Sequence, residues 1–97
     1  MTNEEIWNIG LEERTDELSK LQSEYDRLDV ECRKTEFEMD MYARLREVNN
    51  AMLYKQKFSE KYEKCARESE KLTKQKNALE NEISVLKKEI YYINSLM

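Results

Sequence analysis

The sequence predicts an all-α fold in which long helices form a coiled coil, and three observations lead to this prediction. Apolar side chains recur at alternating steps of three and four residues, and the resulting period of about 3.5 keeps one stripe facing a partner helix. The chain has no proline and one glycine, Gly10, so few positions favour a turn. Charged and apolar residues each make up 39% of the 97 residues, a balance typical of long helices. A helix with one such stripe cannot bury it alone, so we expect the protein to act by association.

The first helical segment, residues 1–44, is acidic and begins with a helix-capping signal. Thr2 and Glu5 have the spacing of a capping box, in which each side chain can satisfy a free backbone N–H. From there one heptad register continues to Tyr42, with Arg14 and Thr35 as polar exceptions at d. Its apolar positions are Leu11, Leu18, Tyr25, Cys32 and Met39 at a, and Trp7, Leu21, Leu28 and Tyr42 at d.

The register does not continue through residues 45–57. The stripe beyond this segment is offset by two residues, so the seam must slip between Tyr42 and Phe58. Either four-residue steps unwind the supercoil locally, or the helix breaks at Asn49–Asn50. The segment is apolar on several faces, which is typical of a helix with more than one neighbour. It includes Leu45, Val48, Ala51, Met52, Leu53 and Tyr54.

The last segment, residues 58–97, has the most regular heptads. Leu79 and Leu86 at d alternate with Ile83 and Ile90 at a, a pattern that favours two parallel strands. We therefore expect a nearly continuous helix that forms a parallel homodimer. The stretch LTKQKNALENEISVLKKEI, residues 72–90, resembles parts of myosin rods and other long coiled coils. The stripe reaches Met97 without a stop signal, so we expect a longer polypeptide to follow.

Charge leaves other arrangements open. Residues 1–50 carry 14 acidic and 7 basic side chains, whereas residues 51–97 carry 7 acidic and 10 basic ones. A parallel dimer would also place Glu24 opposite Asp29 and Glu31 opposite Glu36, and like charges disfavour self-pairing. An antiparallel dimer, a helical hairpin that folds at Asn49–Asn50, a more basic partner for the first half, and a trimer or higher oligomer all remain alternatives.

Two sets of residues follow as candidate interaction sites. The apolar tip around Trp7 and the central cluster of residues 48–54 are candidates for docking other proteins, because aromatic anchors often dominate interfaces. The docking candidates are Ile6, Trp7, Ile9, Val48, Met52, Leu53 and Tyr54. The predicted dimer interface consists of Leu11, Leu18, Leu21, Tyr25, Leu28, Cys32, Met39, Tyr42, Phe58, Tyr62, Cys65, Leu72, Leu79, Ile83, Leu86, Ile90 and Ile93.

Several classes of function find no support in the composition. The chain has no histidine, no closely spaced cysteine pair and no glycine-rich loop, so we expect no enzyme activity, metal or cofactor. A net charge of −4 without a basic run argues against nucleic acid, and no apolar stretch is long enough to span a membrane. We expect no membrane or small-molecule partner. Cys32 and Cys65 lie on the stripe, either as small apolar residues in a reducing compartment or as an interchain disulfide of a parallel dimer.

The sequence therefore predicts a structural or scaffolding coiled coil of an intracellular assembly, located in the cytoplasm or nucleus. It would associate with itself and with at least one other protein, as cytoskeletal, spindle, motor and tethering proteins do. The alternative is a helical subunit of an obligate hetero-oligomer, in which the acidic first half pairs with a different chain.

Overall fold

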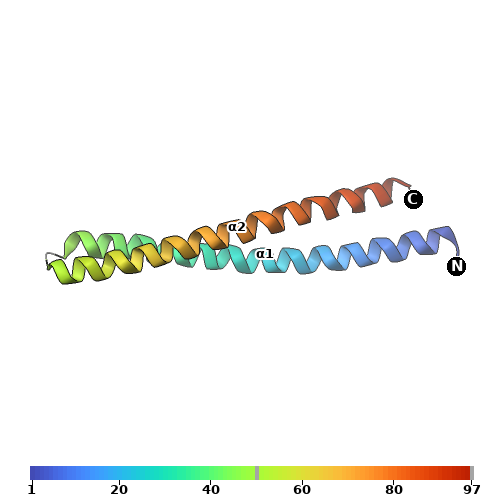
Figure 1. Ribbon diagram of the computed structural model, residues 1–97. Coiled ribbons are helices and arrows are strands. Elements are labelled where there is room, and N and C mark those ends of the chain that lie inside the picture. Colours follow the sequence, from blue (N-terminus) through green and yellow to red (C-terminus); the bar gives the residue numbers. More distant parts are fainter. Residues whose placement is uncertain (50, 97) are drawn as a thin grey trace. The chain divides into compact units, whose positions relative to one another are not determined.

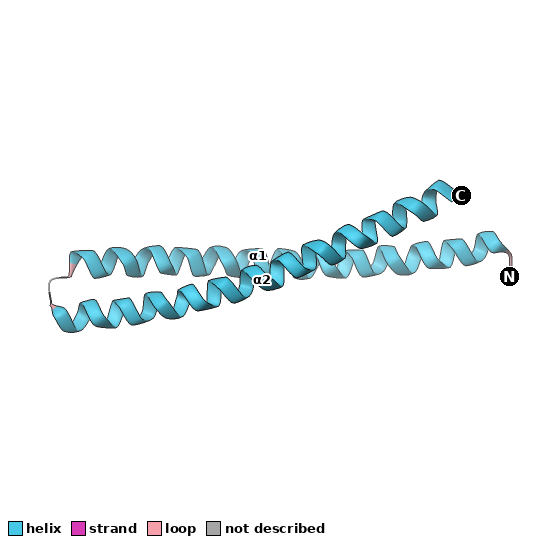
Figure 2. Ribbon diagram, turned by 45° about the horizontal axis from the view of Figure 1, so that its top comes forward, coloured by secondary structure: helices cyan, strands magenta, loops and turns pink. Residues whose placement is uncertain are grey.

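The fold consists of two long helices. The computed structural model describes residues 1–49 and 51–96; Asn50, half of the predicted break, and Met97, a predicted core position, lie outside them. Helix α1 spans Asn3–Val48 and helix α2 spans Met52–Leu96 (Figures 1 and 2), and no strand occurs among the described residues. The predicted all-α class is confirmed.

Both helix boundaries at the ends of α1 have local causes. The backbone N–H of Glu5 donates to Oγ1 of Thr2 at 3.2 Å, as the capping signal predicts. Beyond the last residue of α1, Val48, the side-chain oxygen Oδ1 of Asn49 accepts from the N–H of Ala51 at 3.2 Å. An asparagine that bonds a backbone N–H two residues ahead stabilises a turn. The predicted discontinuity at residues 45–57 is therefore the place where one helix ends and the next begins.

Two compact units make up the chain, and each contains part of both helices. One unit, here called the hairpin unit, comprises residues 28–76. Within it the two helical arms are antiparallel, because contacts to higher-numbered residues of α1 come from lower-numbered residues of α2. Asp29 contacts Lys76, Glu38 contacts Cys65, and Tyr42 stacks on Phe58.

The second unit, here called the terminal unit, comprises residues 1–27 and 77–97. Its two helical segments are antiparallel as well. The guanidinium Nε of Arg14 lies 3.1 Å from Oε2 of Glu89, and the hydroxyl of Tyr25 donates to Oε1 of Glu80 at 3.1 Å. The termini of the chain belong to the same unit.

The direction of pairing corrects the sequence-based expectation. In place of one nearly continuous helix in a parallel dimer, two helices form a coiled-coil-like hairpin, one of the alternatives that the charge left open. The physical reason is electrostatic. In the hairpin unit, residues 28–49 carry six acidic and four basic side chains and face residues 51–76, which carry four acidic and eight basic ones. There Asp29 meets Lys76 rather than Glu24 of a parallel copy. The two-residue offset between the heptad registers of the two halves also needs no local unwinding of a supercoil, because each helix has its own register.

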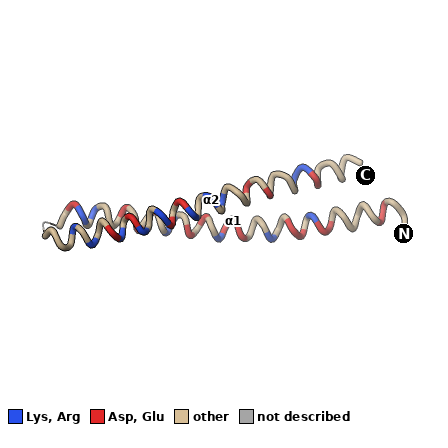
Figure 3. Tube along the Cα trace, in the orientation of Figure 1, with Lys and Arg blue, Asp and Glu red and all other residues tan. Residues whose placement is uncertain are grey.

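The core is narrow and follows the predicted stripes. Each of the six buried apolar residues occupies a predicted a or d position, but among the described residues no large side chain is fully buried. Two helices can cover only one face of each other, and charged residues recur along both helices (Figure 3). The buried apolar residues are Leu28, Cys32, Leu72, Leu79, Leu86 and Ile93.

Candidate functional site

All seventeen residues predicted to form an interface lie in the seams between the two helices. Each of them is buried or half-buried, so the seams follow both heptad registers. The helices of one chain provide both sides of each seam. An interface between two copies through these residues stays a prediction.

The best-defined polar contact of the hairpin unit joins Asp29 to Lys76. The ammonium Nζ of Lys76 lies 2.6 Å from Oδ1 of Asp29, while Arg33, four residues along α1, lies 3.1 Å from Oδ2. The hydrogen bond from Lys76 lowers the pKa of Asp29, and the charges of Arg33 and Lys76 act in the same direction, against the effect of desolvation. Lys76 lies seven residues before Ile83 and therefore also at an a position of the heptad. The bond to Asp29 gives its ammonium a partner within the chain.

A second polar core position, Thr35, is satisfied by its own helix. The hydroxyl of Thr35 donates to the carbonyl oxygen of Glu31 at 2.8 Å, and the residue is buried beside the predicted core position Cys32. A buried hydroxyl needs such a partner, because leaving it unpaired would cost free energy. Thr35 therefore interrupts the apolar stripe without leaving a buried polar group unsatisfied.

The two cysteines are free and differ in their surroundings. Cys32 is buried, and Cys65 is half-buried, with its Sγ 3.6 Å from Oε2 of Glu38. Desolvation raises the pKa of the Cys65 thiol, and the adjacent Glu38 carboxylate raises it further. A thiol with a raised pKa is a poor nucleophile at neutral pH. These contacts therefore favour the interpretation of Cys65 as a small apolar residue of the stripe.

Near the turn, five aromatic and basic side chains stack across the helices. The rings of Tyr42 and Phe58 lie 6.3 Å apart with an interplanar angle of 24°. Lys61 lies 5.5 Å from the centre of the Tyr42 ring, and Arg46 lies 5.4 Å from that of Tyr62. These cation–π contacts join α1 to α2 beside the apolar seam and stabilise the pairing of the two arms near the turn.

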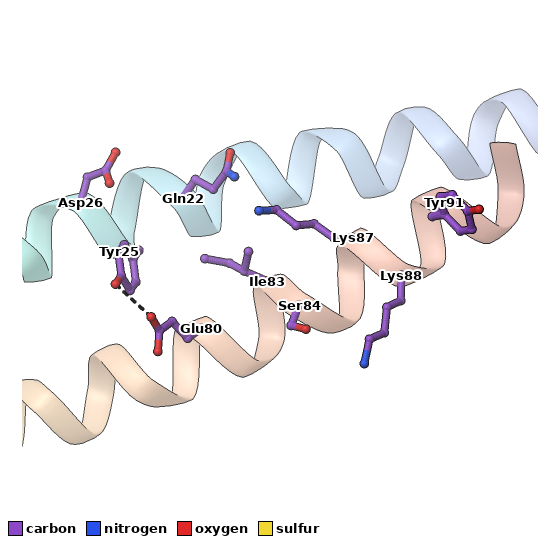
Figure 4. A pocket seen from close by; sticks show the side chains of 9 residues that line it. All are labelled: Gln22, Tyr25, Asp26, Glu80, Ile83, Ser84, Lys87, Lys88 and Tyr91. Atoms are coloured by element: carbon purple, nitrogen blue, oxygen red, sulfur yellow. Dashed lines mark hydrogen bonds between the residues drawn. The ribbon is translucent and has the colours of Figure 1, made fainter.

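An open groove follows the seam of the terminal unit (Figure 4). It measures about 760 Å³, and the Tyr25–Glu80 hydrogen bond bridges it. Lys87 extends toward α1, and Ile83 supplies an apolar wall (Figure 4). Acidic, basic and apolar groups alternate along this groove, so it has no single electrostatic character.

A more apolar groove of about 580 Å³ lies near the chain termini in the same unit. Trp7 and Tyr92 line it from opposite helices, and Gly10 leaves space that a side chain would fill. The guanidinium of Arg14 donates to the carbonyl oxygen of Gly10 at 3.2 Å and pairs with Glu89. The predicted docking residues Ile6 and Trp7 therefore share a concave surface, whereas Ile9 is exposed without lining it.

The other predicted docking residues form the apolar tip of the hairpin unit. Val48, Met52, Leu53 and Tyr54 are 75%, 82%, 74% and 51% exposed. Val48 ends α1 and the other three begin α2, so the turn brings them together. We call these four residues the hairpin tip.

Sequence reasoning missed a second apolar stripe on α1. Val30 and Phe37, seven residues apart, are exposed, and Phe37 is 69% exposed. With Met41, Arg33 and Lys34 they line a shallow groove of about 550 Å³. The seven-residue spacing outside the a and d positions was the signal that could have revealed this outer stripe.

Among the described residues, no cluster of three or more His, Cys, Asp or Glu side chains could hold a metal ion. No helix in the described ranges has a stretch long and apolar enough to cross a bilayer. No protein-family model, curated protein or solved structure matches the chain.

Proposed function

We propose that the chain is a structural module that helps to build an intracellular protein assembly, and that it does so by self-association of its helical hairpin. The observation that carries the proposal is the second apolar stripe on α1, because the intrachain seam leaves Val30 and Phe37 exposed. Apolar side chains in a row on an outer helix face are typical of surfaces that receive another helix.

The charges beside the outer stripe support burial against another helix. Arg33 is paired with Asp29 at 3.1 Å, and Lys34 with Glu31 at 3.7 Å, both within α1. Cations that already have a carboxylate neighbour add little repulsion when two identical stripes meet. A second copy is therefore electrostatically acceptable at this face.

The total surface also supports association. The chain exposes 7555 Å², whereas a monomeric protein of 11.8 kDa exposes roughly 5,900 Å². The difference of about 1,600 Å² is about twice the roughly 800 Å² that each partner buries in a standard interface. The free cysteines are compatible with a reducing cytoplasm or nucleus, which we propose as the location.

The charge argument for a different partner of the first half is weaker than the sequence suggested. Within the hairpin unit, the net-positive arm of α2 lies against the net-negative arm of α1, through pairs such as Asp29–Lys76, so the first half already meets basic groups there. In the terminal unit both segments are net negative, −5 for residues 1–27 and −1 for residues 77–97. We therefore rank the alternative function, a helical subunit of an obligate hetero-oligomer, second to self-association. Cytoskeletal, spindle, motor and tethering assemblies all remain compatible with a self-associating hairpin.

Sedimentation equilibrium over a range of protein concentrations tests the proposal. We expect the wild-type chain to associate, and Val30→Ser with Phe37→Ser to shift it toward monomer by about tenfold in the dissociation constant. Val85→Ser with Tyr91→Ser is the matched control, since it removes two exposed apolar side chains from α2. A wild-type chain that is fully helical and monomeric at all concentrations would contradict self-association and direct the search to a different partner.

A further inference from the structure

We propose that the hairpin tip is a binding site for an anionic lipid surface, into which its apolar side chains insert while nearby cations meet the lipid phosphates. This inference goes beyond the proposed assembly function and does not depend on it. It also departs from the expectation of no membrane partner, which rested on the lack of a spanning segment. A tip that enters only the interface needs no spanning segment.

The distribution of the apolar side chains points to a lipid surface rather than to a protein groove. Met52, Leu53 and Tyr54 are consecutive in a helix, so they project about 100° apart and together cover more than half of its circumference. A helix that docks in a protein groove instead presents residues three and four apart on one face. Lipid surrounds an inserted tip on all sides, and it can therefore cover all of these side chains together.

The charge of the same segment matches an anionic surface. Residues 45–57 carry three basic side chains, Arg46, Lys55 and Lys57, against one acidic side chain, Glu47. This segment has a net charge of +2 in a chain of net charge −4, so the rest of the chain has a net charge of −6. An anionic bilayer would attract the tip and repel the remaining surface, which orients the chain with its tip toward the lipid.

The positions of the cations along the helix fit the depth of a bilayer interface. Lys55 and Lys57 follow Met52 by three and five residues, or about 4.5 to 7.5 Å along the axis of α2. Amphipathic segments bury their apolar groups by about 5–10 Å at the boundary between headgroups and acyl chains. Inserting Met52 and Leu53 to that depth would place the two ammonium groups near the phosphates. Tyr54 lies between Leu53 and Lys55 in the sequence. Tyrosine favours the boundary between headgroups and acyl chains because its ring is apolar and its hydroxyl is polar.

Vesicle binding by the full chain tests the proposal directly. We expect the chain to float with phosphatidylcholine vesicles that contain phosphatidylserine, and to remain behind with pure phosphatidylcholine. Lys55→Gln and Lys57→Gln should each weaken binding about fivefold, because one surface cation contributes about 1 kcal/mol. Lys71→Gln and Lys74→Gln, exposed cations outside the tip, are the matched controls and should have smaller effects.

Fluorescence shows which part of the chain enters the lipid. The chain has one tryptophan, Trp7, so Leu53→Trp in a Trp7→Phe background places the only tryptophan at the tip. We expect its emission to shift to the blue with anionic vesicles, whereas Val85→Trp in the same background should not shift. Met52→Asp with Leu53→Asp should abolish binding, and far-ultraviolet circular dichroism should remain unchanged because both positions are exposed.

Three results would overturn the proposal. One is a wild-type chain that binds neither type of vesicle. Another is a tip tryptophan that does not shift while tip substitutions weaken self-association in sedimentation, because a second copy would then cover the tip. Binding that is lost in the Val85→Asp and Tyr92→Asp control as completely as in the tip variant would also contradict insertion of the tip.

Discussion

Lys76 of α2 donates a hydrogen bond of 2.6 Å to Asp29 of α1, although Lys76 occupies a core position of its heptad. Both side chains are about three-quarters covered, and Arg33 approaches the other oxygen of the same carboxylate. The contact joins residues 47 positions apart in the sequence. It therefore exists only because the two helices are antiparallel.

The first prediction concerns the pH dependence of this contact. The pKa of Asp29 is lowered from its ordinary value of 3.8, so the folded chain favours the carboxylate. Its contribution to stability is present above pH 3.8 and is lost as the pH falls through the lowered pKa. Asp29→Asn should therefore lower the urea midpoint at pH 7, and this effect should shrink as the pH falls below 3.8. A double-mutant cycle with Lys76→Met supplies the control, and additive effects at pH 7 would contradict the pairing.

A second prediction tests the antiparallel direction of the hairpin. The side chain of Glu38 contacts Cys65, so Glu38→Cys would place a thiol beside Cys65 in the same chain. Mild oxidation of this variant should give a disulfide within one chain, detected as a monomer of altered mobility without reductant. Phe37→Cys, whose side chain points outward, should not form it. Wild-type chains linked in pairs through Cys65 would instead indicate parallel dimers.

The third prediction compares the seam with the tip. Leu79 is buried in the seam of the terminal unit, so Leu79→Ala should reduce the free energy of unfolding by about 2 kcal/mol. Leu53→Ala, the same change at an exposed position, should stay within about 0.5 kcal/mol of wild type. Urea denaturation followed by circular dichroism measures both values. Equal losses at the two positions would contradict this assignment of the core.

The fourth prediction is that Gly10→Ala stabilises the chain. Gly10 lies inside α1 without a positive φ, and a methyl group there would meet Nη1 of Arg14 at 3.4 Å, an ordinary contact. Alanine in a helix interior is favoured over glycine by about 1 kcal/mol. Thermal unfolding should therefore shift upward by several degrees. Destabilisation would mean that the bond from Arg14 to the carbonyl of Gly10 cannot tolerate the methyl group.

Heptad patterns alone predicted which residues form the seam. Leu28, Cys32, Leu72, Leu79, Leu86 and Ile93 are buried, and they lie at the predicted a and d positions. The pattern succeeds because helix geometry determines which side chains share a face, whatever the partner helix is. The same reasoning correctly placed the discontinuity between residues 45 and 57.

Other features required contacts that no local pattern contains. The seven-residue spacing of Val30 and Phe37 is present in the sequence, but that the two side chains stay exposed followed only once the partner of the a and d face was known. Likewise, Lys76 could be placed in the core from its register, but nothing local identifies Asp29 as its partner. Pairing between distant residues depends on the direction of the second helix.

The sequence by itself determined that this chain is helical, that each half carries one apolar stripe, and that the two halves have opposite net charges. These properties follow from residue spacing and composition, which act over one or two helical turns. Only the tertiary structure decided that the stripes cover each other within one chain and that the tip residues Met52 and Leu53 are exposed. A stripe specifies a face to be buried but not the identity or direction of the helix that buries it. The turn at Asn49 and charge pairs such as Asp29–Lys76 together make that choice.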